Sequence, residues 1–74
     1  MTTIKDVIVK EPKGRIWYLI VDADGVKYST KNMILAALAQ RLREKKARVE
    51  MQSFGGWYYR ELFSIKEEGK EAVA

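Results

Sequence analysis

Short hydrophobic runs rich in β-branched and aromatic residues alternate with polar turns along the first 30 residues. Runs of this kind are typical of strands, and they cover residues 4–11, 15–23 and 26–30. The first two are separated by "PKG" at 12–14, and the next two by Asp24-Gly25. Because an Asp-Gly pair readily adopts the positive φ angles of a type I′ turn, it predicts a two-residue hairpin. The sequence therefore begins with three predicted strands.

The pattern changes to a helical one at Asn32. Ile34, Leu38 and Leu42 recur every four residues, which predicts an amphipathic helix that buries these three side chains. Its N-cap is expected at Ser29, Thr30 or Asn32. Beyond the helix, residues 47–54 and 57–66 have strand composition and are expected to be joined by a tight turn at Gly55-Gly56. We expect residues 1–66 to form one domain and the short acidic tail, 67–74, to be frayed.

The predicted order of elements is three strands, one helix and two further strands. It runs from "IKDVIVKE" to "WYYRELFSIK". In a chain of this length the order resembles the OB-fold, a five-stranded Greek-key barrel that binds single-stranded nucleic acid and oligosaccharides. The resemblance rests on element order alone and implies a mainly β protein with one helix. An SH3-like barrel, or an open sheet with the helix on one face, is the alternative.

The predicted turn at Asp24-Gly25 sets the faces of the second and third strands. It pairs Val21 with Tyr28 and Asp22 with Lys27, because side chains alternate between faces along a strand. The face that carries Tyr18, Ile20 and Asp22 also carries charge, so we expect it to be the outer one. Trp17 and Tyr28 then belong to the core.

A turn at Gly55-Gly56 similarly pairs Phe54 with Trp57 and Gln52 with Tyr59. Phe54, Trp57, Tyr59 and Phe63 then share a face with several charged or amide groups, which are costly to bury. These rings are expected to be exposed, whereas Val49, Met51, Ser53, Tyr58 and Leu62 form a core strip. Arg60 does not suit that strip, and a single bulge in the last strand would exchange the faces and bury Trp57.

The composition excludes several kinds of chemistry. The 74-residue chain has no cysteine and no histidine, so disulfides and the usual zinc ligands are absent and burial must hold the fold together. "DADG" at 22–25 is not expected to bind calcium, because such a loop needs glutamate at its twelfth position, where this chain has Met33. The carboxylates are scattered, and we expect no enzymatic activity, metal or cofactor. The apolar runs are too short for a membrane span and the N-terminus does not resemble a signal peptide, so we expect a cytoplasmic protein.

Charge supplies the functional hypothesis. The net charge is +4, and residues 1–49 hold eleven Lys and Arg against five Asp and Glu. A basic domain with aromatic side chains on a strand face is suited to single-stranded DNA or RNA, because rings stack on bases and cations meet phosphates. We expect binding with little sequence preference, by a monomer or small homo-oligomer. The expected contact residues are Lys13, Arg15, Tyr18, Lys27, Arg48, Trp57, Tyr59 and Arg60. The alternative is a protein-binding adaptor or inhibitor module, or a homodimer that buries the face of Trp57, because aromatic residues also dominate protein interfaces.

Overall fold

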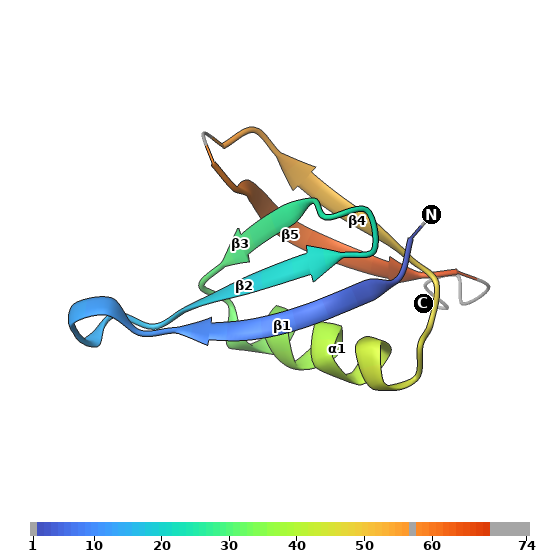
Figure 1. Cartoon of the computed structure of the whole chain (residues 1–74), viewed down its shortest axis with the longest axis horizontal. Coiled ribbons are helices and arrows are strands. Elements are labelled where there is room, and N and C mark those ends of the chain that lie inside the picture. Colours follow the sequence, from blue (N-terminus) through green and yellow to red (C-terminus); the bar gives the residue numbers. More distant parts are fainter. Residues whose placement is uncertain (1, 57, 69–74) are drawn as a thin grey trace.

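The computed structural model describes residues 2–56 and 58–68 and has the predicted order of elements (Figure 1). A single α-helix lies between the third and fourth strands, as the sequence predicts. The elements are β1 (Ile4–Lys10), a 3₁₀ turn (Pro12–Gly14), β2 (Trp17–Asp22), β3 (Lys27–Thr30), α1 (Met33–Glu44), β4 (Val49–Phe54) and β5 (Arg60–Glu67).

The strands form one five-stranded mixed sheet in the order β1-β2-β3-β5-β4. All neighbouring strands are antiparallel except β3 and β5, which run parallel and pair through Tyr28 with Arg60 and Ser29 with Glu61. The sheet is not closed into a barrel. An isolated bridge between Thr2 and Val49, with N···O distances of 3.0 and 2.7 Å, nevertheless holds the segment before β1 against the start of β4.

One face of the curved sheet packs on α1 and forms the core. Figure 1 shows the helix lying along that face, next to β1. The buried side chains come from every strand and from the helix: Ile4, Ile20, Tyr28, Ala39, Leu42, Val49, Leu62 and Ile65. Among the described residues, no helix is long and apolar enough to cross a membrane.

The helix begins at the Asn32 cap, one of the three predicted positions. The Asn32 Oδ1 atom accepts hydrogen bonds from the backbone N–H groups of Ile34 (2.8 Å) and Leu35 (3.3 Å). Leu42 is buried, as predicted, and Leu38 packs against the core. The prediction was wrong for Ile34, whose side chain is 77% exposed, because it lies off the buried stripe of α1, which consists of Ala36, Ala39 and Leu42.

The β2–β3 hairpin exists, but its predicted register was wrong by one residue. Ile20 lies opposite Tyr28 and Val21 opposite Lys27. The cause is Asp22, whose Oδ1 atom accepts hydrogen bonds from the backbone N–H groups of Asp24 (2.9 Å) and Val26 (3.0 Å). This cap lengthens the loop to three residues and places Gly25 at φ 84°, where glycine carries no steric penalty. Asp22 and Ile20 are consequently buried, so the face predicted to be outer is the inner one.

The predicted register of the last hairpin was also wrong. Phe54 pairs with Glu61 rather than with residue 57, so the β4–β5 connection is a longer loop instead of a two-residue turn. Gly56 is needed for a different reason: a Cβ atom there would overlap the carbonyl oxygen of Tyr59. Farther along, Gln52 pairs with Ser64 and Ser53 with Leu62, so β5 bulges at Phe63. A bulge in the last strand is therefore present.

The far edge of the sheet is partly covered by the helix. The Arg43 Nε atom donates a hydrogen bond of 2.8 Å to the carbonyl oxygen of Lys5, and the guanidinium lies 3.8 Å from the Asp6 carboxylate. A side chain that satisfies an edge carbonyl reduces the chance that another strand pairs there. Arg43 thus protects the start of β1.

Candidate functional site

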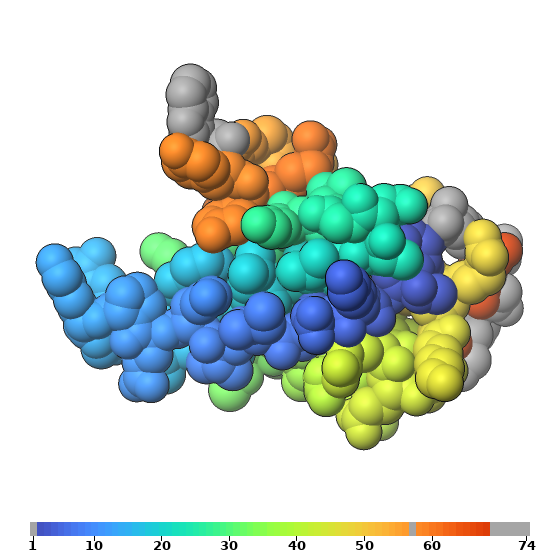
Figure 2. Space-filling model, viewed as in Figure 1, coloured from blue at the N-terminus to red at the C-terminus, as the bar shows by residue number. Residues whose placement is uncertain are grey.

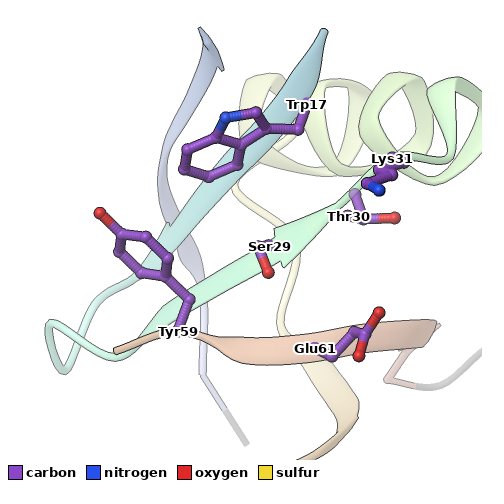
Figure 3. Close-up of a pocket in the computed structure, with 6 residues that line it drawn as sticks. All are labelled: Trp17, Ser29, Thr30, Lys31, Tyr59 and Glu61. Atoms are coloured by element: carbon purple, nitrogen blue, oxygen red, sulfur yellow. The ribbon is translucent and has the colours of Figure 1, made fainter. Parts of the chain in front are cut away.

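A hollow of about 240 Å³ lies on the face of the sheet opposite α1, above the junction of β2, β3 and β5. It is lined by Trp17, Ser29, Thr30, Lys31, Tyr59 and Glu61. The Trp17 and Tyr59 rings stand on neighbouring sides of it, with their centroids 5.4 Å apart and their planes tilted by 43° (Figure 3). Such rings, both half-buried, expose part of their surfaces to a flat ligand.

The fold brings these residues together from distant parts of the sequence. Trp17 opens β2 directly after the β1–β2 hairpin, and Tyr59 precedes β5 at the end of the β4–β5 loop. Ser29 pairs with Leu19 on β2 and with Glu61 on β5. Because directly paired residues point to the same side of a sheet, the two rings, Ser29 and Glu61 share one face. The parallel β3–β5 pairing therefore creates the hollow.

Several cations lie on the face of the sheet that bears the hollow or on the β1–β2 hairpin. Lys31 lines it directly. Lys27 is paired with Val21, and Lys10 with Trp17, so both belong to the same face of the sheet. Lys13 and Arg15 lie on the exposed hairpin beyond β1, which projects from the body in Figure 2. Within residues 2–56 and 58–68, none of these five side chains takes part in an ion pair or a side-chain hydrogen bond.

The structure separates several predicted contact residues from this group. Tyr18 lies on the helix side of the sheet, where it lines a second hollow with Val9 and Met33. Arg48, at the start of β4, pairs with Glu68 at 3.0 Å. The Arg60 Nε atom donates a hydrogen bond of 2.8 Å to the Ser53 hydroxyl on β4. Trp57 lies outside the described residues. Of the predicted frayed tail, residues 69–74 also lie outside them. Its first two residues are ordered: Glu67 belongs to β5, and the Glu68 N–H donates a hydrogen bond to the carbonyl oxygen of Arg48.

The sequence interpretation assigned two of the rings to the wrong environment. Trp17 was expected in the core but is half-buried and lines the hollow, whereas Tyr58, also expected in the core, is 84% exposed. Tyr28 is buried as predicted. A usable signal was available for Trp17: in "DADG" the first aspartate can cap its own turn. That interpretation would have predicted a buried Asp22 and an outward-facing Trp17.

A second exposed aromatic pair lies on the β4–β5 hairpin. Phe54 and Phe63 have ring centroids 5.9 Å apart, and both were correctly predicted to be exposed. Their exposed fractions are 53% and 56%. This Phe54–Phe63 patch is apolar, and neither ring lines the hollow, although Phe54 pairs with Glu61 on the same face of the sheet.

Titratable groups offer little evidence for catalysis. In the described ranges, no three His, Cys, Asp or Glu side chains are grouped so that they could hold a metal ion. The pKa of Tyr28 is raised by burial and by the nearby Asp22 carboxylate, whose Oδ2 atom accepts a hydrogen bond of 3.2 Å from the Tyr28 hydroxyl. This pair faces the core rather than the hollow, so its role is structural.

The chain matches no protein-family model, no curated protein and no solved structure.

Proposed function

We propose that this protein is a non-enzymatic, OB-like module that binds single-stranded DNA or RNA across the hollow. The observation that carries the proposal is the tilted Trp17–Tyr59 ring pair, open to solvent and beside Lys31. Aromatic faces stack on bases of any identity, and nearby ammonium groups attract phosphates. An extended nucleic-acid strand presents both groups at once.

The topology supports the OB-like interpretation. The strand order, the position of α1 and the Thr2–Val49 bridge are compatible with the partly open Greek-key arrangement that we propose. OB-folds bind oligonucleotides on the face of the second and third strands, between the loops that join strands 1–2 and 4–5. In this chain the hollow lies there: Trp17 follows the first of these loops and Tyr59 ends the second.

The charge distribution decides which of the predicted cations we retain. The predicted cations Lys13, Arg15 and Lys27 are exposed and unpaired within the described part of the chain, and so is Lys31, which was not predicted. They can therefore meet phosphates without breaking an existing contact. Arg48 already pairs with Glu68, just beyond β5, and Arg60 with Ser53 on β4, so we assign them a structural role.

The test is fluorescence anisotropy with a labelled 15-nucleotide dT strand at low and physiological salt. Trp17→Ala and Tyr59→Ala should each weaken binding by about 1 to 3 kcal/mol, the amount typical of one stacked base. Lys31→Ala should also lower the log–log salt slope by up to about one unit. Circular dichroism confirms that each variant is folded.

Matched controls are available on the same sheet. Phe63→Ala removes an exposed ring from the other patch, and Lys66→Ala removes an exposed cation from the far end of β5. Both should bind the dT strand as the parent does. Absence of binding by the folded parent, or equal losses in the control variants, would refute the proposal.

The Phe54–Phe63 patch favours a second candidate, a protein interface. Two adjacent exposed rings on an outer hairpin are a common feature of interfaces, and β4 is an edge strand of the sheet. Light scattering over a concentration series distinguishes the two functions. A dimer that Phe54→Ser or Phe63→Ser dissociates, with no response to oligonucleotide, would favour the interface.

A further inference from the structure

The Glu61 carboxylate lines the hollow, although a phosphate-binding surface would be expected to exclude negative charge. Figure 3 shows it across the hollow from the Tyr59 ring, with Ser29 between them. Glu61 is exposed, and its carboxylate has no hydrogen bond or ion pair within residues 2–56 and 58–68. A carboxylate accepts hydrogen bonds only. The hollow therefore offers an unused acceptor beside two aromatic faces.

Acceptor and cations together restrict the ligand. A simple anion would be repelled by Glu61, and a simple cation would be repelled by Lys31 and by the net charge of +4. A ligand that suits both has a neutral ring with N–H donors at its edge and an anionic group outside the hollow. A nucleotide with a donor-bearing base meets this description.

The size of the hollow limits the occupant to a single base. Its volume of about 240 Å³ lies below the roughly 300 to 1,000 Å³ typical of pockets that enclose a drug-sized ligand. A base stacked on Tyr59 or Trp17 would direct one edge toward Ser29 and Glu61, because Ser29 lies in the middle of the hollow and Glu61 lies across it from Tyr59. The edge that reaches Glu61 then determines which base is preferred.

We propose that Glu61 makes this hollow selective for guanine, a preference that rests on the nucleic-acid function proposed above. Guanine presents two adjacent donors, N1–H and the N2 amino group, and can bind both carboxylate oxygens at once. Adenine and cytosine offer a single amino group next to an acceptor nitrogen. Thymine and uracil offer one N–H between two carbonyl oxygens, which a carboxylate repels. The proposed binding surface thus has one position that selects a base, whereas the rest of it tolerates any sequence.

The experiment measures the binding of 11-nucleotide dT strands whose central residue is dG, dA, dC or dT. The dG strand should bind about fivefold to tenfold more tightly than the others, the lower part of the range for a bidentate contact, because Glu61 is open to water. Inosine at the centre, which lacks the N2 amino group, should lose most of this preference. The analogue 7-deazaguanine keeps both donors and should retain it.

Glu61→Gln and Glu44→Gln form a matched pair of variants. Each removes one negative charge, but Glu44 lies at the end of α1, away from the hollow. Glu61→Gln should reduce the guanine preference to less than twofold and tighten dT binding slightly, because it removes a negative charge from the binding surface. Glu44→Gln should keep the preference. Loss of the preference in both variants would show that the preference depends on overall charge and not on a contact with Glu61.

The outcomes separate this inference from the proposed function. Trp17-dependent binding that is equal for all four strands would overturn guanine selection while the nucleic-acid function stands. No binding to any strand would overturn both. Saturable binding of tetramethylammonium, lost in Trp17→Ala and Glu61→Gln, would instead identify the rings and carboxylate as a pocket for methylated cations.

Discussion

The Tyr28 hydroxyl donates a hydrogen bond of 3.2 Å to the Oδ2 atom of Asp22, and both side chains are buried. The other oxygen of the same carboxylate binds two backbone N–H groups of the β2–β3 loop. One aspartate therefore fixes both the loop and the position of the tyrosine in the core. The strand register and the outward face of Trp17 depend on this arrangement.

Removing the hydroxyl should destabilise the fold without disturbing its shape. In Tyr28→Phe the ring still fills the core, but the buried Oδ2 atom loses its donor, which costs about 1 to 3 kcal/mol. Urea unfolding measures the loss. Tyr58→Phe is the control, because that side chain is 84% exposed and its hydroxyl has no comparable partner in the described structure. Equal stability of Tyr28→Phe and the parent would show that the hydrogen bond contributes nothing.

The same pair predicts how stability changes at alkaline pH. The pKa of Tyr28 is raised in the folded protein by burial and by Asp22, whereas a tyrosine in the unfolded chain titrates near pH 10. The folded state therefore favours the protonated ring. The stability this provides is complete below about pH 10 and is lost as pH rises through the folded pKa. Thermal melts between pH 8 and 11.5 should show a steeper alkaline decline for the parent than for Tyr28→Phe, and parallel curves would contradict this.

Two positions on α1 should respond in opposite ways. Leu42 is 3% exposed and packs in the core, so Leu42→Ala should cost about 2 to 5 kcal/mol. Ile34→Ala should change the free energy of unfolding by less than about 0.5 kcal/mol, because a substitution at an exposed position away from packed groups has little effect. Urea unfolding compares the two. Similar losses would mean that the first turn of the helix is covered in solution.

The two consecutive glycines should also differ. Gly55 has open space where a Cβ atom would lie, but a Cβ atom on Gly56 would overlap the Tyr59 carbonyl oxygen. Gly56→Ala should therefore displace Tyr59 and change the NMR signals of both the Tyr59 and Trp17 rings. In Gly55→Ala these signals should remain as in the parent. An unperturbed Trp17–Tyr59 pair in Gly56→Ala would refute the close approach.

The sequence predicted the elements better than their registers. Hydrophobic spacing located five strands and the helix, because these features depend on local periodicity, and the Asn32 cap was one of three predicted positions. Register depends on single interactions instead. The Asp22 carboxylate bound the loop backbone and shifted the β2–β3 pairing by one residue, and the bulge at Phe63 and the longer loop altered the β4–β5 pairing.

Prediction of the candidate site depended on these strand registers. Tyr59 lines the hollow and Lys27 lies on the same face of the sheet, as predicted, but Ser29, Lys31 and Glu61 were not foreseen as site residues. They meet only through the parallel β3–β5 pairing. A parallel contact between segments about thirty residues apart leaves no periodic trace in the sequence. Trp17 required the correct hairpin register before its outward orientation could be recognised.

The short parallel junction between β3 and β5 has a mechanical consequence. It divides the sheet into a three-strand meander and a two-strand hairpin, and only Tyr28–Arg60 and Ser29–Glu61 are paired across it. Trp17 belongs to the meander and Tyr59 to the hairpin. A ligand that contacts both rings would bridge this short junction, and because its binding requires both halves in place, it would stabilise their pairing. The stability of the β3–β5 junction would then increase with ligand occupancy of the hollow.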